Sequence, residues 1–325
     1  MAGKPSVSVI IPSYNCARYV CEAVDSVLAQ TSPADEIIVV DDGSTDDTRA
    51  RLEAYRDRTV YIEQPHSGVA RARNRGIEDS SGTLIAFLDA DDRWLPEKLE
   101  RQLEHLASHA RADLIHTNFL HWNDRTGELT RSARNPQRAS GRCYLEFFWY
   151  TRVMTSSILL TRRCLDRVGG FDEHIPGRYA EDIDLCLRIA RAHELAYLPE
   201  PLVLYRRHEG NTTAPGYDAA MAECILYVFE KALADDPAVR SLLGEQQIAE
   251  ALRAFAFYAG YQRANAGELA AARRDFRAAL RYAPRSLYAW SMWGSTFLPA
   301  PLRFLLRAAK QHLVARAQRG IRESV

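Results

Sequence analysis

The stretch Glu36-Ile37-Ile38-Val39-Val40-Asp41-Asp42-Gly43-Ser44 contains the pattern that decides the fold class of this chain. Four β-branched residues in succession are typical of a strand that is buried on both faces of a parallel sheet. The apolar run stops at Asp41, and Ser44 or Thr45 can cap a helix that follows it. A buried strand that leads through a short turn into a helix indicates the crossover unit of an α/β protein.

The same alternation of strand and helix continues through the first 110 residues. The predicted strands are Val7–Pro12, Glu36–Val40, Val60–Ile62 and Leu84–Leu88, and the predicted helices include Ala17–Gln30 and Val69–Glu78. Residues 111–212 extend the pattern, with strands at Leu114–Phe119, Ser156–Leu160 and Leu202–Arg206, a turn at Asn123–Gly127 and a helix at Glu181–His193. We therefore predict a doubly wound, mostly parallel sheet flanked by helices.

The strand signals stop after Thr213, so residues 213–325 are predicted to form an all-helical C-terminal region. Helical patterns cover 218–235, 245–265, 268–282 and 285–297, with breaks at Pro237, Gly267 and Pro284. The helix pair around Gly267 resembles one tetratricopeptide unit, but one copy is not a repeat array. The predicted domains are therefore 1–212, with halves at 1–110 and 111–212, and 213–325.

The distribution of charge and the composition predict which kinds of partner and which compartment this protein has. The net charge is zero, but residues 251–325 contain 13 Lys and Arg and three Asp and Glu, so that segment carries +10 and residues 1–250 carry −10. Such a split predicts an acidic body that can hold a cation and a basic end that meets an anionic surface. The start of the chain shows no cleavable leader pattern and no apolar run reaches 18 residues, and the six scattered cysteines predict reduced thiols, so we expect a cytoplasmic protein.

Polar residues cluster where the predicted strands end, and ligands of open α/β sheets bind at that edge. These residues are Ser13-Tyr14-Asn15 after the first strand, Asp41-Asp42 after the second and Asp89-Ala90-Asp91-Asp92 after the fourth. Five carboxylates at one edge would raise one another's pKa values, and a divalent cation removes that conflict. Carboxylate oxygens suit Mn²⁺ or Mg²⁺, which commonly bind together with phosphate oxygens.

Arginines near this edge could bind such a phosphate ligand. Arg71, Arg73 and Arg75 lie in one predicted helix, where Arg71 and Arg75 share a face and Arg73 is nearly opposite, so they cannot all face the ligand. Taken singly, Asp42 would be read as part of a helix cap, and Asp89–Asp92 as a solvated loop. Their common position at strand ends favours a diphosphate and metal site.

Several motifs together resemble the successive signatures of family 2 glycosyltransferases. They are Pro12-Ser13-Tyr14-Asn15, Val40-Asp41-Asp42-Gly43-Ser44, Gly68-Val69-Ala70-Arg71-Ala72-Arg73-Asn74, Asp89-Ala90-Asp91-Asp92, Gly169-Gly170-Phe171-Asp172, Glu181-Asp182 and Tyr205-Arg206-Arg207-His208. They occur in family order over roughly residues 5–212, which is far more specific than any one motif. The resemblance implies a GT-A fold, a nucleotide-diphosphate sugar donor such as a UDP-sugar, a divalent metal and inversion at the anomeric carbon.

The resemblance also implies roles for donor-binding residues. Asp42 matches the carboxylate that accepts from the base, usually uracil, and Pro12, Ser13, Tyr14 and Asn15 belong to the same pocket. Asp89, Asp91, Arg71 and Arg73 are the further candidates for contact with the donor. Asp91 matches the ribose-side acid of a DxD element, Asp92 the main metal ligand, and His208 a histidine that reaches the metal or diphosphate. Asp91, Asp92 and His208 are therefore the metal candidates. The resemblance also makes residues 1–110 the nucleotide-sugar-binding half and residues 111–212 the acceptor half.

The catalytic candidates are Asp182 and its neighbour Glu181. Asp182 matches the general base of the family, and inverting transfer needs a carboxylate near the acceptor hydroxyl. The Gln-x-x-Arg-Trp element of processive synthases is missing, which argues against a polymerising enzyme. For Asp182 and His208 the alternative interpretation is a solvated surface residue.

The predicted partners are a nucleotide sugar and a saccharide or lipid-linked saccharide acceptor, with no nucleic acid, in surface polysaccharide or glycolipid assembly. Residues 301–318 have the pattern of a basic amphipathic helix, so 299–325 is a candidate for peripheral contact with the inner face of an anionic membrane, or for packing on the preceding helices. Two alternatives stay open: a nucleotidyl- or phospho-transferase that uses the same metal-diphosphate site, and a catalytically inactive membrane-docked scaffold.

Overall fold

A computed structural model describes residues 5–131, 140–147, 153–176, 179–209, 211, 219–299 and 302. The chain divides into two compact units. The sheet unit comprises Met1–Gly216 and Tyr227–Leu242, and the helical unit comprises Tyr217–Leu226 and Leu243–Val325. The sheet unit thus includes a helical segment, 227–242, that lies beyond residue 212.

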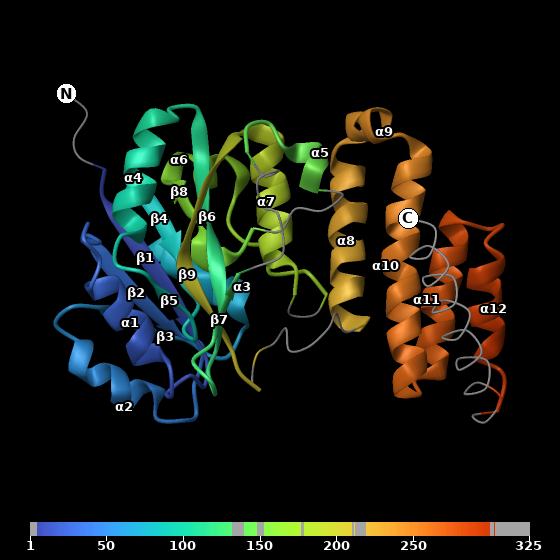
Figure 1. The fold of residues 1–325 in the computed structure, drawn as a ribbon, viewed down its shortest axis with the longest axis horizontal. Coiled ribbons are helices and arrows are strands. Elements are labelled where there is room, and N and C mark those ends of the chain that lie inside the picture. Colours follow the sequence, from blue (N-terminus) through green and yellow to red (C-terminus); the bar gives the residue numbers. More distant parts are fainter. Residues whose placement is uncertain are drawn as a thin grey trace, which may run out of the picture. The chain divides into compact units, whose positions relative to one another are not determined.

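The first half of the sheet unit is parallel, as the alternating pattern predicts (Figure 1). Its strands are β1 (Val7–Ser13), β2 (Glu36–Asp41), β3 (Val60–Glu63) and β4 (Leu84–Phe87), in the order β3-β2-β1-β4. Its helices are α1 (Val20–Leu28), α2 (Thr48–Leu52) and α3 (Val69–Asp79), with a 3₁₀ turn at Glu53–Tyr55. Because β1, β2 and β4 are buried along almost their whole length, their apolar residues form much of the core.

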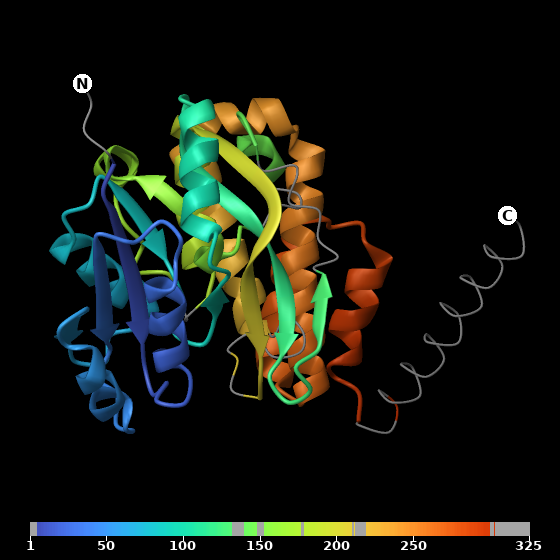
Figure 2. The same cartoon turned by 60° about the vertical axis from the view of Figure 1, so that its left-hand side comes forward.

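The second half continues the same sheet beyond β4. The added strands are β8 (Leu159–Thr161), β6 (Ala112–Asn123), β9 (Glu194–Arg207) and β5 (Arg93–Trp94), in that order, with β7 (Leu129–Arg131) paired to β6. β8 runs antiparallel to both β4 and β6, whereas β6 and β9 are parallel to each other. Figure 2 shows β6 and β9 as two long, bent strands side by side. The helices of this half are α4 (Lys98–Ser108), α5 (Tyr144–Phe147), α6 (Arg162–Val168) and α7 (Glu181–Ala192).

Two boundaries in this half differ from the sequence-based expectation. The strand expected from Ser156 begins only at Leu159, because Thr155–Ser157 form a 3₁₀ turn. The short extended segment expected at Leu202–Arg206 is the end of a strand that starts at Glu194 and contains two prolines. The β6–β9 register shifts beside those prolines, which is how a strand accommodates residues that cannot donate to the ladder.

The remaining helices are α8 (Ala219–Asp235), α9 (Pro237–Leu243), α10 (Glu245–Ala266), α11 (Leu269–Tyr282) and α12 (Leu287–Ser295). α10 and α11 form a hairpin through Gly267, whose φ of +85° suits glycine. α9 was not expected: Pro237 is the first residue of a short helix and not only a break. The expected amphipathic helix at 301–318 lies outside the described residues, apart from Leu302.

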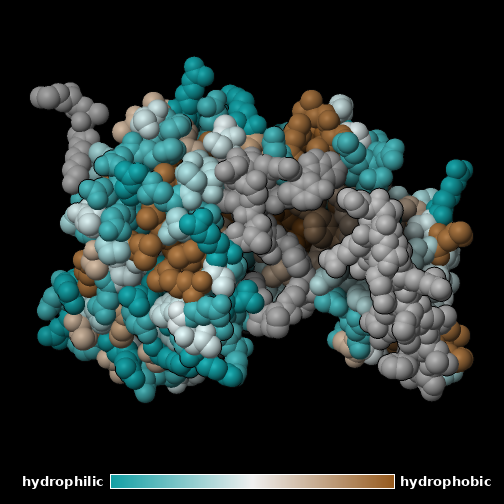
Figure 3. Space-filling view, in the orientation of Figure 1, coloured by the Kyte–Doolittle hydropathy of each residue, from teal (hydrophilic) through white to brown (hydrophobic). Residues whose placement is uncertain are grey.

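The next features are the state of the cysteines, the polarity of the surface and the hydropathy of the helices. All six cysteines are free thiols. On the face drawn in Figure 3, hydrophilic residues cover most of the sheet unit, with small hydrophobic patches among them. None of the helices in the described ranges is long and apolar enough to cross a membrane.

Candidate active site

The ends of β1 and β2 form the first wall of the candidate site. Tyr14, which is partly exposed, stacks on His66 with ring centroids 4.0 Å apart. Asn15 has a φ of +48°, and its side-chain oxygen accepts from the Thr45 amide at 2.7 Å, so the turn after β1 is bound to the turn after β2. Ser13 is buried, and its hydroxyl has no partner in the described structure. Pro12, another predicted donor residue, lies buried within β1.

Asp42 is buried at the end of β2, and its carboxylate organises the loop that follows β3. One oxygen accepts from the side chain of Gln64 at 2.7 Å and the amide of Ser67 at 2.8 Å. The other accepts from the amide of Gly68 at 2.8 Å and lies 2.8 Å from Nδ1 of His66. These contacts occupy the acceptor sites that a carboxylate offers. Asp42 therefore fixes the loop that presents His66, the ring on which Tyr14 stacks.

Arg73 links two segments that are 92 residues apart in sequence. Its guanidinium donates to Asp89 at 2.7 Å and to Glu181 at 2.6 Å, and its side chain is only 4% exposed. Burial opposes the charge, but the two carboxylates outweigh it and hold the pKa of Arg73 above its ordinary value. A buried cation therefore joins Asp89 to Glu181, the first residue of α7.

The loop before α7 is fixed to the same helix as Arg73. Asn74 accepts from the amide of Phe171 at 2.8 Å and donates to its carbonyl oxygen at 2.8 Å. A Cβ added to Gly170 would lie 2.4 Å from the Asn74 oxygen, so only glycine fits this approach. Ala180, which precedes α7, has a φ of +72°, a conformation that L-residues rarely adopt. The positions of Glu181 and Asp182 thus depend on a close contact and a strained residue.

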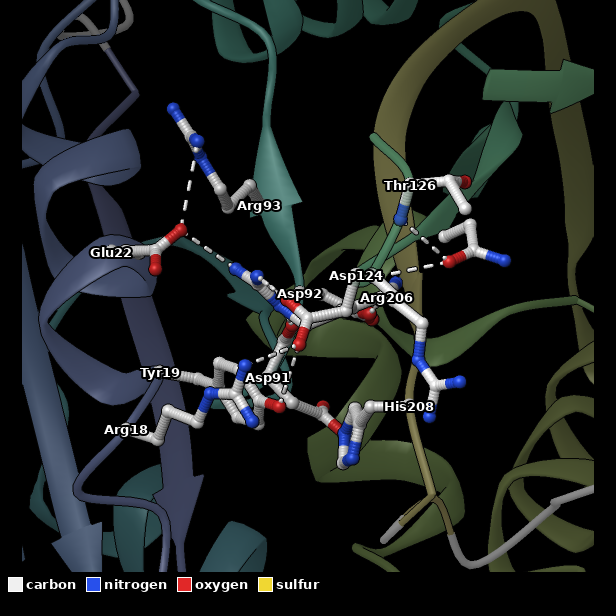
Figure 4. Close-up of polar contacts among 12 residues, drawn as sticks. Arg18, Tyr19, Glu22, Asp91, Asp92, Arg93, Asp124, Thr126, Arg206 and His208 are labelled. Carbon is white, nitrogen blue, oxygen red and sulfur yellow. Dashed lines mark hydrogen bonds and ion pairs between the residues drawn. The ribbon is translucent and has the colours of Figure 1, made fainter. Parts of the chain in front are cut away.

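Asp91 and His208 approach each other from the ends of β4 and β9. The Asp91 carboxylate lies 3.1 Å from Nε2 of His208 and 3.4 Å from the side-chain nitrogen of Asn211. Figure 4 shows the two side chains pointing toward one another. Both side chains remain partly exposed, His208 at 15% and Asp91 at 27%. The expectation that His208 reaches a metal or diphosphate stays a prediction, and the structure places His208 beside Asp91.

Asp92 has a different environment from Asp91. It is completely buried, and its carboxylate accepts from the hydroxyl of Ser156 at 2.6 Å and from the amide of Arg206 at 3.0 Å. Burial, followed by the charges of Asp91 and Asp89, raises the pKa of Asp92 well above its ordinary value. The carboxylate that we expected to be the main metal ligand is therefore turned into the protein and holds β9 and the loop before β8.

Arg206 is a buried residue of this site whose role the sequence did not reveal. It donates to the Asp91 carbonyl at 2.7 Å, to Asp124 at 2.7 Å and to Glu22 at 2.8 Å. Its guanidinium also stacks on two aromatic rings, Tyr19 at 4.5 Å and Trp122 at 4.0 Å. The only available signal was a charged residue within a strand-like run, since an arginine there must be paired if it is buried.

The remaining candidates are Arg71, Asp182 and Glu181. Arg71 forms ion pairs with Glu78 at 2.9 Å and Glu173 at 3.4 Å, on the opposite face of α3 from Arg73, as helical spacing predicts. The Asp182 carboxylate, in the first turn of α7, accepts from the amide of Ile183 at 2.8 Å. Glu181, its neighbour, is held by Arg73.

The described side chains fit a metal only if the substrate completes its coordination. No three His, Cys, Asp or Glu residues in the described part of the chain are grouped so that they could hold an ion by themselves. Asp91 and His208 offer one carboxylate and one imidazole at the edge of the sheet. Mg²⁺ and Mn²⁺ commonly take one or two protein ligands together with phosphate oxygens, so this donor set fits a cation that binds with a diphosphate.

Sequence comparisons agree with the motifs. Residues 8–169 match the family model described as Glycosyl transferase family 2. An uncharacterized glycosyltransferase of Rickettsia prowazekii is 32% identical over 212 residues, which cover 64% of this chain and 66% of the relative. TuaG of Bacillus subtilis, whose name assigns it to teichuronic acid biosynthesis, is 51% identical over 106 residues, 31% of this chain and 42% of TuaG. The matches thus cover two thirds or less of the length of these relatives.

Solved structures show the same fold. The crystal structure of residues 1–349 of S. aureus TarS has a TM-score of 0.66 at 19% identity, with 94% of this chain and 92% of that chain covered. A mannosyltransferase from Pyrobaculum calidifontis, solved in complex with GDP-Man and Mn²⁺, has a TM-score of 0.58 at 20% identity and covers 98% of this chain. The predicted GT-A fold is confirmed, and through its domain at residues 8–169 the chain belongs to glycosyl transferase family 2.

Proposed function

We propose that this protein transfers a sugar from a nucleotide-diphosphate sugar to an acceptor hydroxyl, with inversion and with a divalent cation. The observation that carries the proposal is the arrangement around Arg73, which connects the donor-side acid Asp89 with Glu181. In the same site Asp91 and His208 lie 3.1 Å apart and partly exposed at the ends of two strands. These contacts support a site that combines diphosphate-binding groups with a carboxylate for proton transfer, as a sugar transfer requires.

The residues would divide the chemistry as follows. The acceptor oxygen forms a bond to the anomeric carbon while the bond from that carbon to the diphosphate oxygen breaks. Asp182 accepts the proton of the acceptor hydroxyl in this proposal, because it matches the general base of the family and Glu181 is already engaged by Arg73. The nucleoside diphosphate leaves from the side of Asp91.

The metal would be held by Asp91 and His208, and Asp92 would support the loop from behind. A ligand needs an accessible oxygen, and the Asp92 carboxylate is buried with two donors on it. When bound, a divalent cation would neutralise charge that develops on the leaving diphosphate. We therefore assign to Asp91 the metal-binding role that the sequence favoured for Asp92.

A UDP-sugar is the proposed donor, and the assembly of a surface polysaccharide or glycolipid the proposed setting. TarS has been solved in complex with UDP-GlcNAc, and TuaG is named for teichuronic acid biosynthesis, which together support this choice. Thermal unfolding of the protein with Mn²⁺ and UDP-, GDP- or dTDP-sugars tests the donor, because a ligand that binds the folded state raises its melting temperature. Stabilisation by none of these sugars would refute the donor assignment.

Two substitutions separate binding from catalysis. Asp91→Asn is expected to abolish the metal-dependent stabilisation by the donor. Asp182→Asn is expected to keep that stabilisation but to lower sugar transfer or donor hydrolysis by about 100-fold or more. Asp57→Asn, at a highly exposed carboxylate, is the matched control and is expected to change neither. Donor binding without any turnover in the wild type would favour the scaffold alternative, and release of nucleoside monophosphate with pyrophosphate would favour a nucleotidyltransferase.

Membrane contact is a separate proposal for the helical unit. Leu287, Trp290, Phe297 and Leu302 are exposed apolar side chains within or just after α12. The basic character of residues 251–325 complements an anionic bilayer. Sedimentation with vesicles that contain phosphatidylglycerol is expected to depend on residues 299–325, and unchanged sedimentation after their removal would contradict the proposal.

A further inference from the structure

A basic cavity lies at the edge of the sheet opposite the candidate active site. The candidate site follows the carboxyl end of β4, whereas Leu84, at its amino end, pairs with Thr161 of β8. Asp113 lies near the start of β6, and Glu194 starts β9 alongside Ala112. Because Leu84 and Asp89 are five residues apart, the two edges are separated by roughly 15 Å of strand. The cavity of about 570 Å³ at the amino edge therefore belongs to a different site.

Four arginines line this cavity, and two of them have no carboxylate partner among the residues that the structure describes. Arg163 pairs with Asp113 at 2.6 Å, and Arg142 lies 3.7 Å from Glu194. Arg111 and Arg167 line the same cavity, and neither forms an ion pair with a residue that the structure describes. The lining thus carries an excess of two positive charges, and guanidinium groups suit phosphate oxygens in particular.

A buried histidine adds a second, independent observation. The His193 side chain is 7% exposed, and its Nδ1 lies 2.7 Å from the Asp113 carboxylate. Its Nε2 is buried without a hydrogen-bond partner in the described structure, although His193 lines the cavity. A buried polar atom of this kind lacks a partner that a ligand could supply.

Asp113 fixes the floor of the cavity. Its carboxylate accepts from Thr161 at 2.8 Å and from Arg163 at 2.6 Å in addition to its contact with His193. Burial opposes the charge, but these hydrogen bonds outweigh it and lower the pKa of Asp113 below its ordinary value. The cationic and imidazole groups around it are therefore held in place before any ligand arrives.

An apolar cavity adjoins the basic one and shares Arg163 with it. This second cavity has a volume of about 460 Å³, and its apolar lining residues are Leu84, Leu106, Ala110 and Ala112, beside the charged Arg162 and Asp166. A ligand that spans both cavities would carry a phosphate group next to an apolar part. We propose that the amino edge of the sheet is a second ligand site, which binds the phosphate group of an organic phosphate through Arg111, Arg163, Arg167 and His193 and seats its apolar part in the adjoining cavity.

Calorimetric titration of the full chain with hexyl phosphate and with inorganic pyrophosphate tests this site, in the presence of saturating UDP to occupy the candidate active site. Both compounds are expected to bind, with hexyl phosphate the tighter of the two because it alone reaches the apolar cavity. The double variant Arg111→Gln and Arg167→Gln is expected to weaken both by at least about tenfold, because it removes two charge-assisted contacts.

The matched control is Arg58→Gln with Arg281→Gln, two exposed arginines of the same chain at other places. It removes the same net charge and is expected to leave binding unchanged. UDP binding and the melting temperature are expected to be the same in both double variants. Titration with vesicles that contain phosphatidic acid then identifies the source: binding that the Arg111 and Arg167 substitutions abolish assigns a lipid phosphate, and binding of the soluble compounds alone assigns a soluble one.

Two results would overturn the proposal. One is that the wild-type protein binds neither hexyl phosphate nor pyrophosphate when UDP is present. The other is that the variant at Arg111 and Arg167 binds them as well as the control variant does. Neither result depends on sugar transfer, so failure here is distinct from failure of the proposed activity.

Discussion

The arginines at the two edges of the sheet differ in burial and in ion pairing. At the carboxyl edge, the Arg73 and Arg206 side chains are 4% and 2% exposed, and each bridges two carboxylates. At the amino edge, the Arg163 and Arg142 side chains are 68% and 79% exposed, and the neighbouring Arg111 and Arg167 have no ion pair among the described residues. The same residue type is thus built into the protein at one edge and presented to solvent at the other.

The difference shows what a buried ion pair does here. A buried arginine with complete partners has little charge left to offer a ligand, but it fixes the segments that it joins. An exposed arginine contributes little to stability and stays available for binding. We therefore expect substitutions at the carboxyl edge to disturb geometry and stability, and substitutions at the amino edge to disturb only ligand binding.

The largest effect is expected for Arg73→Met. The substitution leaves Glu181 and Asp89 without their cation, so α7 and the loop after β4 lose their common anchor. Sugar transfer is expected to fall by about 100-fold or more, and the free energy of unfolding by about 3 kcal/mol. Arg71→Gln, on the exposed face of the same helix, is the control for both measurements. Equal activity of the two variants would show that the bridge does not position the site.

Arg206→Gln is expected to have the next largest effect, mainly on stability. It removes contacts to Asp124, Glu22 and the Asp91 carbonyl, together with the stacking on Tyr19 and Trp122. Chemical denaturation is expected to show a loss of about 2–3 kcal/mol. Arg207→Gln, one residue further along and exposed, is expected to change the unfolding free energy by less than about 0.5 kcal/mol. A loss of similar size at both positions would contradict this account.

Asp92→Asn is expected to have a smaller effect that depends on pH. Because the folded state raises the pKa of Asp92, it binds a proton that the unfolded chain releases near pH 4. The wild type therefore loses stability as the pH rises from about 4 toward the raised pKa, and the asparagine variant lacks that loss. Unfolding free energies measured from pH 4 to 8 are expected to shift in favour of the variant as the pH rises. Parallel curves for the two proteins would refute the raised pKa.

The smallest effect on stability is expected for Arg163→Gln at the amino edge. Its side chain is largely exposed, and Asp113 keeps Thr161 and His193 as partners after the substitution. The free energy of unfolding is expected to change by less than about 1 kcal/mol, and sugar transfer to stay at the wild-type rate. A loss of transfer activity would mean that the two edges are coupled. It would contradict the expectation that substitutions at the amino edge disturb only ligand binding.

Much of the fold could be predicted from sequence because its signals are local. The β-branched run Ile37–Val40 is buried as a parallel strand should be, and the break at Gly267 separates two helices. The strand 194–207 was underestimated, because its prolines argue against a strand unless a register shift accommodates them. α9 was missed because a proline at the first position of a helix looks the same as a proline that ends one.

The candidate site was only partly predictable. Asp42, Asp89 and Asp91 could be predicted to lie at one edge of the sheet, because each follows the end of a predicted strand. That prediction needs only the order of strands and helices. The distinction between Asp91 and Asp92 could not be made, because it depends on which carboxylate meets Ser156 and the Arg206 amide.

The sequence by itself determined the class of fold, the family and the set of acidic residues, because hydrophobic periodicity and motif spacing are properties of neighbouring residues. Only the tertiary structure decided which charged residues form ion pairs with one another. Arg73 meets Glu181 across 108 residues and Arg206 meets Glu22 across 184, distances at which only the packed sheet brings side chains together. Burial then raises the pKa of Asp92, and at the amino edge it is Arg111 and Arg167 that have no ion pair among the described residues, since the energy of a charge depends on its surroundings and not on its place in the chain.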